Sequence, residues 1–376
     1  MKTYPSARPH IRAKEKKHVL EVLNSGVLSI GQKQETFEKN IAKLVGVKYA
    51  AAVSSGTAGL HLALLAADIG PGDEVITTPF SFVASANTIL YVGAKPVFVD
   101  IDPLTYNIDP NKIEKAVTRK TKAILAVHIF GQPAEMNPIL RIAKKYKLKI
   151  IEDACESLGA TYRGRQAGTF GESAVFAFYP NKQMTTGEGG VVVTQNKKIL
   201  ELIKSLRNQG RSEDLRWLDH NKLGYNYRMD ELSAALGLAQ LEKIGWLFRE
   251  RGRVADWYNK ILSEASDSIR LPAVADGNTH TWFVYVVSIK NPKINRDKVI
   301  KDLGKEGVAA KPYLPSIHLL SFYKEKFGFK KGDFPVSEAV SNSVLALPFY
   351  IGLKKQDIKT ISQKVIEVIK KHAKRV

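Results

Sequence analysis

The chain has a single cysteine, Cys155, among its 376 residues, so a disulfide cannot form within it. A lone thiol is typical of proteins from a reducing compartment, and we therefore expect a cytoplasmic protein. No uncharged apolar run approaches the length of a membrane span. Residues 1–18 are polar and lack the apolar stretch of a secretory signal peptide. Cys155 itself lies in the segment IEDACES, where a small buried hydrophobe is a simpler interpretation than a nucleophile.

Acidic residues are scarce relative to basic ones, and the formal net charge is +20. Such a surplus suits either a nucleic acid or a small anionic substrate such as a nucleotide diphosphate. The lysines and arginines are scattered, with short runs at 14–17, 144–149 and 370–375, and neither a zinc-finger spacing nor an aromatic RNA-binding strand is present. The distribution favours a small anionic molecule. A regulatory nucleic-acid-binding protein is the non-enzymatic alternative.

Internal repeats and low-complexity segments are also missing, and from Tyr49 onward short apolar runs alternate with helical patterns. This alternation predicts an α/β protein with a mostly parallel sheet covered by helices. Strands are expected at 50–53, 74–78, 96–100, 124–129, 149–152, 173–178 and 190–194. Two earlier helices, at 14–26 and 34–46, are each expected to end at a glycine.

A long amphipathic helix is expected at about 230–246, and the pattern of apolar and polar residues changes after it. The remaining segments, including WFVYVVSI and a closing helix at 356–375, predict a smaller α/β domain. We place the boundary near 245–255. The expected domains are therefore a large one over 1–250 and a small one over 251–376.

The most informative segment is AVFAFYPNKQMTTGEGG, which places Lys182 between an apolar strand and a Gly-rich loop. Upstream, IIEDACESLGA places Asp153 at the end of another strand. Both residues fall at strand carboxyl ends, where α/β sheets bind ligands. A buried acid and a reactive amine are what pyridoxal phosphate chemistry needs. The amine forms a Schiff base with the cofactor aldehyde, and the acid keeps the pyridinium nitrogen protonated.

Two further segments are compatible with a cofactor site. SSGTAGLHLALLA begins a helix at Gly56 and Thr57, whose backbone amides suit a phosphate, although a simple helix cap is the alternative. TTPFSFVASAN puts Phe82 after a strand, where it either stacks on a flat ring or packs in the core.

Over almost its full length the chain resembles the sugar aminotransferases of the DegT/DnrJ/EryC1/StrS group, which are fold-type I pyridoxal phosphate enzymes. The matching segments occur in the expected order: SSGTAGLHLAL, TTPFSFVASANTILYVGAKPVFVDID, HIFGQPAEM, IIEDACESLGATYRGRQAGTFG, FAFYPNKQMTTGEGG, LGYNYRMDELSAALGLAQL, KPYLPSIHLLSFY and ALPFY. The resemblance implies a large domain with a mostly parallel seven-stranded sheet and a smaller C-terminal α/β domain.

The resemblance also implies a role for each candidate cofactor residue. Lys182 would form the Schiff base and carry the proton between the amino donor and the cofactor, while Asp153 pairs with the pyridinium nitrogen. Phe82 would stack on the ring, and Gly56 and Thr57 would hold the phosphate.

Two further residues complete the cofactor site that the resemblance implies. Glu156 would lie near the cofactor's 3′-oxygen. Asn226 would reach the phosphate from a neighbouring subunit, which implies a homodimer with a composite site. No metal is expected.

The chain departs from the pattern of many relatives at two positions. Ala177 stands where many have a serine that donates to the phosphate, and Tyr179 stands where many have histidine. Tyr179 is a candidate for the sugar site, with plain packing as the alternative. The presence of Lys182 disfavours the relatives that replace this lysine with histidine and act as dehydratases.

The function that we expect is a ping-pong transaminase that takes its amino group from L-glutamate. By resemblance the acceptor is a ketone on a nucleotide-diphosphate sugar, and the ending TTGEGG resembles relatives that act at C4 of 4-keto-6-deoxy sugars. A C3 sugar or a keto-inositol is the alternative acceptor. Arg228, Tyr313 and His318 are candidate substrate residues, and a surface arginine, a packed tyrosine and a capping histidine are the respective alternatives.

Overall fold

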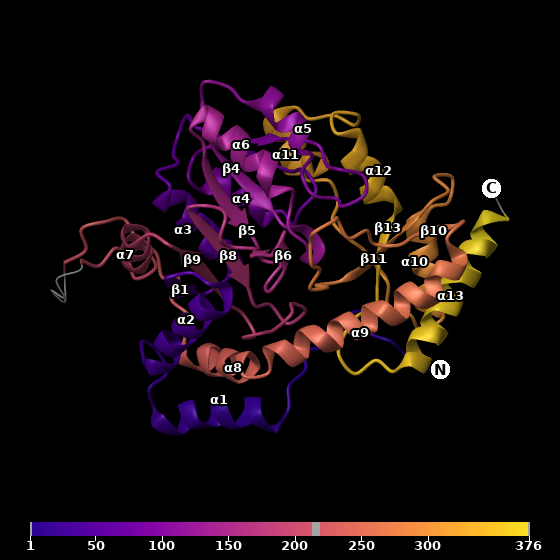
Figure 1. Ribbon diagram of the computed structural model, residues 1–376, viewed down its shortest axis with the longest axis horizontal. Helices are drawn as coiled ribbons and strands as arrows, with labels where there is room; N and C mark the ends of the chain where they lie inside the picture. Colours follow the sequence, from indigo (N-terminus) through magenta and orange to yellow (C-terminus); the bar gives the residue numbers. More distant parts are fainter. Residues whose placement is uncertain (1, 213–218, 375–376) are drawn as a thin grey trace.

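A computed structural model describes residues 2–212 and 219–374 and places a seven-stranded sheet at the centre of the molecule (Figure 1). The strand order is β1-β9-β8-β5-β4-β2-β3, and β9 runs in the direction opposite to the other strands of this sheet. The strands are β1 (Tyr49–Val53), β2 (Glu74–Thr77), β3 (Lys95–Phe98), β4 (Thr121–Val127), β5 (Lys149–Asp153), β8 (Ser173–Ala177) and β9 (Gly190–Thr194). The predicted α/β fold with a mostly parallel sheet is confirmed.

Helices cover both faces of this sheet, which explains why its strands are apolar runs rather than alternating patterns. One face packs against α3 (Gly56–Ala66) and α7 (Lys197–Leu206), and the other against α2 (Gln32–Val45) and α8 (Glu231–Leu241). The other helices of this part are α1 (Ala13–Ser25), α4 (Ala84–Tyr91), α5 (Pro110–Ile113) and α6 (Met136–Tyr146).

The ends of the first two helices follow the glycine pattern. Gly26 and Gly46 have φ angles of +69° and +79°, the left-handed conformation that ends a helix at little cost for glycine. The predicted ends of α1 and α2 are therefore confirmed.

The prediction of one helix at 230–246 is wrong, because α8 ends at Leu241 and α9 (Ile244–Leu262) begins after a break. The N–H of Lys243 donates to the carbonyl of Gln240, three residues back, and its amine contacts His10 and Glu15 of the N-terminal segment. These contacts stabilise a bend at residues 242–243, just before Gly245 in the first turn of α9. Most of α8 is buried, so it is not the amphipathic helix that we expected.

A second sheet has the order β10-β11-β13-β12 and is antiparallel throughout. Its strands are β10 (Ile269–Arg270), β11 (Tyr285–Ile289), β12 (Lys311–Pro312) and β13 (Val344–Leu347). Helices α9, α10 (Arg296–Lys305) and α13 (Lys355–Ala373) share a core with it, whereas α11 (Ser321–Phe327) and α12 (Pro335–Ser343) lie toward the large sheet. The end of the predicted closing helix, Arg375, lies outside the described residues.

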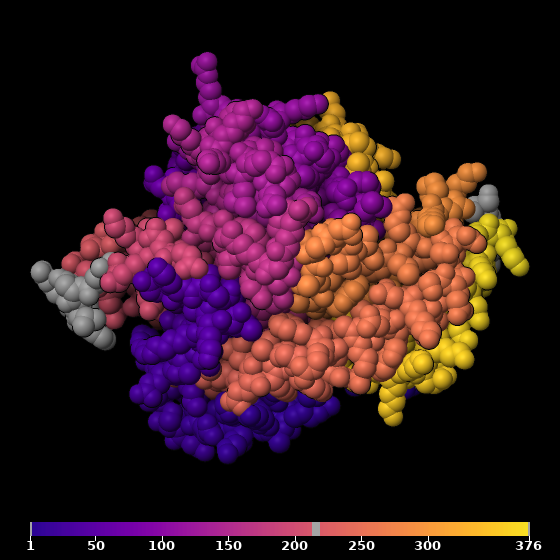
Figure 2. Space-filling model, in the orientation of Figure 1, coloured from indigo at the N-terminus to yellow at the C-terminus, as the bar shows by residue number. Residues whose placement is uncertain are grey.

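The two parts are in continuous contact, and the surface of α9 crosses the lower face between them in Figure 2. The predicted boundary at residue 250 lies within α9, so the division into two domains stays a prediction. The N-terminal segment also joins the parts: the carbonyl of Ser6 accepts from Phe349, and Tyr4 pairs with Val308 before the chain reaches α1. In the part of the chain that the structure describes, no helix has the length and apolar character needed to cross a membrane.

Candidate active site

A cavity of about 610 Å³ lies at the carboxyl ends of β4, β5 and β8, beside the start of α3. The segment 312–315 of the smaller sheet covers it from the other side. Eight of the residues predicted from the sequence line this cavity: Gly56, Thr57, Phe82, Asp153, Glu156, Tyr179, Lys182 and Tyr313. The sheet therefore brings together groups that are far apart in the chain.

Asp153 is the last residue of β5, and its buried carboxylate is held by two donors. The hydroxyl of Ser85, in α4, donates to it at 2.6 Å, and the N–H of Cys155 donates at 3.2 Å. Ser81 contacts the Ser85 hydroxyl at 2.7 Å and extends the chain of hydrogen bonds. A buried carboxylate needs such donors, and they fix its orientation toward the cavity. Ser85 was not predicted as a site residue, although it lies in the same segment, TTPFSFVASAN, as Phe82.

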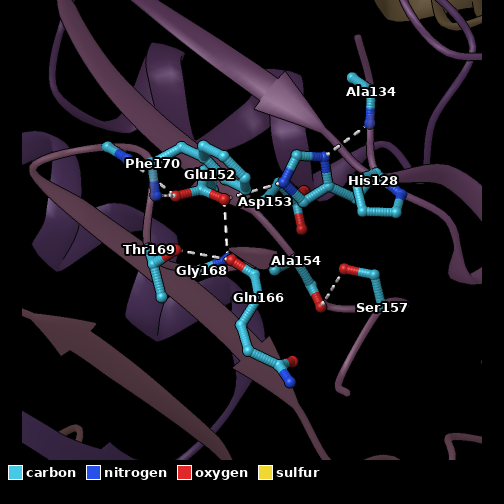
Figure 3. A network of polar contacts seen from close by, with 12 residues as sticks. His128, Ala134, Glu152, Asp153, Ala154, Ser157, Gln166, Gly168, Thr169 and Phe170 are labelled. Atoms are coloured by element: carbon cyan, nitrogen blue, oxygen red, sulfur yellow. Dashed lines mark hydrogen bonds and ion pairs between the residues drawn. The ribbon is translucent and has the colours of Figure 1, made fainter. Parts of the chain in front are cut away.

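The neighbouring residue in β5, Glu152, lies in a fully buried network that fixes the end of the strand (Figure 3). Its carboxylate accepts three backbone N–H groups of the loop 168–171 at 2.6 to 2.8 Å and contacts Nε2 of His128 at 2.9 Å. His128 Nδ1 accepts the N–H of Ala134 at 3.1 Å, so Nε2 carries the proton that faces Glu152. This network holds β5, and therefore Asp153, in place.

Lys182 follows β8 in a tight turn, and its N–H donates to the carbonyl of Tyr179 at 2.9 Å. The Gly-rich segment behind it folds back, and Thr185 and Thr186 both donate to the carbonyl of Phe178. The amine of Lys182 lies 3.5 Å from a carboxylate oxygen of Glu156 and 3.8 Å from the centre of the Phe283 ring. The side chain is mostly buried and faces the cavity.

Glu156 is held from two sides. Its carboxylate accepts the N–H of Phe130 at 2.8 Å, and its carbonyl accepts from the side chain of Gln183. Phe130 has a φ of +59°, an unusual conformation for a residue with a side chain that turns its N–H toward Glu156. Burial raises the pKa of Glu156, while the amine of Lys182 and the Phe130 N–H oppose that rise.

The start of α3 forms the next wall of the cavity. Ser55 caps the helix by accepting the N–H of Ala58 at 3.0 Å, which leaves the amides of the first residues, at Gly56 and Thr57, available to an anion. A Cβ atom at Gly56 would lie 2.7 Å from Cβ of Ala177 and 3.0 Å from the Cys155 sulfur. Only glycine therefore lets α3 approach the end of β8 this closely.

Three aromatic residues line the opening. Phe82 is 63% exposed and Tyr179 is 51% exposed, so neither is a core residue in this chain. Tyr313 is half-buried, with its ring centre 5.6 Å from that of Phe130 and 6.0 Å from that of Phe283. Burial raises the pKa of Tyr313 well above its usual value, so the hydroxyl keeps its proton at neutral pH.

Three predicted site residues, Asn226, Arg228 and His318, do not line the cavity in this chain. Asn226 is exposed and pairs through its backbone with Asn208, whose side chain also accepts from Arg228 at 2.8 Å. His318 is fully buried, and its Nε2 lies 3.0 Å from a carboxylate oxygen of Glu338. Its position indicates a structural role.

A family model, the DegT/DnrJ/EryC1/StrS aminotransferase family, matches residues 9–366. The chain belongs to this family. GDP-perosamine synthase of Caulobacter vibrioides is 39% identical to it over 366 residues, which cover 96% of this chain and 97% of that protein. The resemblance to this family that the sequence motifs indicated is confirmed.

Solved structures agree with this assignment. PseC of Helicobacter pylori, an aminotransferase involved in the biosynthesis of pseudoaminic acid, superimposes with a TM-score of 0.92 at 29% identity and covers 98% of this chain and 100% of its own. DesV of S. venezuelae, solved in complex with a ketimine intermediate, has a TM-score of 0.90 at 31% identity and matches over 100% of both chains. The protein is a pyridoxal phosphate-dependent aminotransferase of fold-type I, as predicted.

The residues of the cavity fit this cofactor. The close approach of Gly56 to Ala177 and Cys155 leaves the first amides of α3 facing the cavity, where they would hold the phosphate. Asp153 would hold the proton of the ring nitrogen, and Lys182 would supply the amine. When bound, pyridoxal phosphate supplies an aldehyde and an electron-withdrawing ring. The remaining tasks, which are orientation, exclusion of water and proton movement, fall to this chain.

Proposed function

We propose that this aminotransferase moves the amino group of L-glutamate to the C4 keto group of a nucleotide-diphosphate 4-keto-6-deoxy sugar, in the cytoplasm. The observation that carries the proposal is that Asp153 and Lys182 line one cavity together with the start of α3. The acceptor is supported by the 39% identical relative named GDP-perosamine synthase. The ending TTGEGG supports C4 by resemblance alone.

In this proposal Lys182 is the residue that moves the proton. Its mostly buried amine faces the cavity from a turn that two threonines hold, so it can take a proton from Cα of the donor and return it at a fixed position. Phe82 stacks on the cofactor ring, and Glu156 lies near the 3′-oxygen. Tyr179 and Tyr313, at the opening, contact the sugar.

The proposal includes a homodimer in which a second copy completes the site. Asn226 is exposed in the single chain, and Leu223 nearby is 85% exposed, which is unusual for a side chain of this size. Arg228 is half-buried and holds the loop next to Asn226 through Asn208 and Gln209. We propose that this segment enters the cavity of the partner, where Asn226 reaches the phosphate and Arg228 lies near the substrate.

A spectral half-reaction with a panel of acceptors tests the proposal. The protein is loaded with pyridoxal phosphate, L-glutamate is added until the visible absorbance is lost, and the donor is removed. Candidate ketones are then added one at a time: 4-keto nucleotide sugars, 3-keto nucleotide sugars and a keto-inositol. Recovery of the band with a 4-keto nucleotide sugar supports the proposed acceptor. Recovery only with a 3-keto sugar or the keto-inositol replaces it, and failure of glutamate to remove the band contradicts the proposed donor.

A further inference from the structure

Arg251, in α9, is a buried cation behind the wall of the cavity and only 5% exposed. Its Nε donates to the carbonyl of Trp282 at 2.8 Å, and its Nη2 donates to the carbonyl of Phe283 at 2.7 Å. The planar guanidinium therefore holds two consecutive carbonyls with two N–H groups of fixed relative orientation. Its other close neighbour is the ring of Phe349, whose centre lies 5.1 Å away. Within the described residues no carboxylate forms an ion pair with Arg251.

The segment that Arg251 holds is in an unfavourable backbone conformation. Trp282 has a φ of +55°, which is rare for a residue with a bulky side chain and persists only where surrounding contacts enforce it. The neighbouring N–H groups of Thr281 and Phe283 donate to the carbonyls of Gly131 and Phe130 at 2.8 and 3.0 Å. Arg251 completes this set from the opposite side, so the segment is held at its N–H groups and at its carbonyls.

The conformation of this segment determines where the ring of Phe283 lies. The amine of Lys182 is 3.8 Å from the centre of that ring, within the range of a cation–π interaction. The negative face of an aromatic ring stabilises a positive charge above it, and more strongly where water is excluded. Phe283 therefore favours a charged nitrogen at Lys182.

We propose that Arg251 is a positioning residue that holds Phe283 under the nitrogen of Lys182 and thereby favours the charged form of that nitrogen. Arg251 does not line the cavity that contains Asp153, although it and Lys182 both line a small neighbouring cavity. Its hydrogen bond to the carbonyl of Phe283 connects it to the ring beside Lys182. The inference rests on the proposed role of Lys182 as the amine that binds the cofactor.

Other titratable or charged groups also face Lys182 or its turn, from β5, β8, the loops after them, the segment 312–315, the N-terminal segment and α9. They are Asp153, Cys155, Glu156, Tyr179, Glu188, Tyr313, Arg8, His10 and Arg251. Of these groups, only Arg251 is replaced in the Arg251→Lys variant described below. A difference in pH midpoint between Arg251→Lys and the parent protein therefore results from the change at Arg251 and its effect on the segment that it holds.

The test is a pH titration of the visible absorbance of the protein loaded with pyridoxal phosphate. Arg251→Lys keeps a cation but lacks the planar guanidinium that holds two carbonyls in a fixed relative orientation, and Phe283→Leu removes the ring. Each is expected to lower the pH midpoint of the band by about one unit, because the charged nitrogen loses the ring face. The double variant is expected to match Phe283→Leu alone, since both changes remove one interaction. Arg253→Lys, at an exposed position of the same helix, is the matched control and keeps the parent midpoint.

A merely structural role for Arg251 would lower the melting temperature and leave the midpoint where it is, which overturns the proposal. Additive shifts in the double variant overturn it as well, and so does an unchanged midpoint in Phe283→Leu even if Arg251→Lys fails to fold. Lys182→Ala separates this inference from the proposed function. A visible band that survives in Lys182→Ala contradicts the role of Lys182, whatever the Arg251 variants show.

Discussion

The amine of Lys182 lies 3.5 Å from a carboxylate oxygen of Glu156, and the two residues follow different strands of the large sheet. Neighbouring strands bring them together at one edge, and Glu156 is further held by the N–H of Phe130. Because this carboxyl group is buried, its charged form is stabilised mainly by Lys182. The protonation of Glu156 therefore depends on whether that amine is charged.

Glu156→Gln is expected to change how stability depends on pH in the cofactor-free protein. Burial raises the pKa of Glu156 in the folded state, so the folded protein binds this proton more tightly than the unfolded chain. Stability from this group is present below the unfolded pKa, about 4.3, and is lost as pH rises through the folded value. The free energy of unfolding of Glu156→Gln, relative to that of the parent, should therefore increase as pH rises from 4 to 7. Urea unfolding at several pH values measures the difference, and a constant difference contradicts the prediction.

Glu152→Gln is expected to destabilise the fold strongly. The carboxylate accepts three backbone N–H groups and faces the Nε2 proton of His128, whereas an amide has only one oxygen to offer them. Buried donors then remain unpaired, at a cost of about 2–5 kcal/mol in the free energy of unfolding. Urea unfolding measures it, with Glu264→Gln at an exposed position as the control. A loss no larger than that of the control would show that the network does not support β5.

Ser85→Ala is expected to weaken cofactor binding by about 10- to 100-fold, because one hydrogen bond to a buried carboxylate is worth roughly 1.5–3 kcal/mol. The lost donor is the 2.6 Å contact that orients Asp153. Spectral titration with pyridoxal phosphate measures the dissociation constant, and Ser266→Ala, at an exposed position, is the control. Equal affinities of Ser85→Ala and the parent protein would contradict an orienting role.

The net charge of +20 predicts a salt effect on the proposed acceptor. A nucleotide diphosphate is drawn to a basic protein by interactions that salt screens, with a screening length of about 10 Å at 0.1 M. Added salt should therefore raise KM for the nucleotide sugar more than it lowers kcat. Steady-state kinetics over a salt series measures both constants, and a KM that does not change with salt would remove this support for a nucleotide sugar.

Much of the site could be predicted because its chemistry lies in short segments at strand ends. Asp153 and Lys182 lie at the ends of short apolar runs that are easily recognised in the sequence. A parallel sheet brings the carboxyl ends of such strands to one edge. Phe130 and Trp282 could not be predicted, since their positive φ angles depend on partners from distant segments. The break before α9 has the same origin, because the contacts of Lys243 that accompany it are tertiary.

The roles of two further predicted residues depend on a second chain and are not visible in a single copy. Asn226 and Arg228 lie away from the cavity in a single copy, and their proposed roles require a partner. A size measurement of the purified protein is expected to give a dimer. In mixtures of Lys182→Ala and Asn226→Ala chains, mixed dimers contain one cavity that lacks neither residue. Such mixtures should regain activity that neither variant has alone, and an absence of recovery in confirmed mixed dimers contradicts a composite site.

The most direct test of the account is to locate the lysine that binds the cofactor. The loaded protein is reduced with borohydride to make the attachment permanent, digested, and its labelled peptide identified by mass spectrometry. We expect the label on Lys182, and we expect Lys182→Ala to lose the label, the visible absorbance and turnover, whereas Lys197→Ala on α7 keeps all three. A label on another lysine, or full turnover in Lys182→Ala, would contradict the assignment of the site.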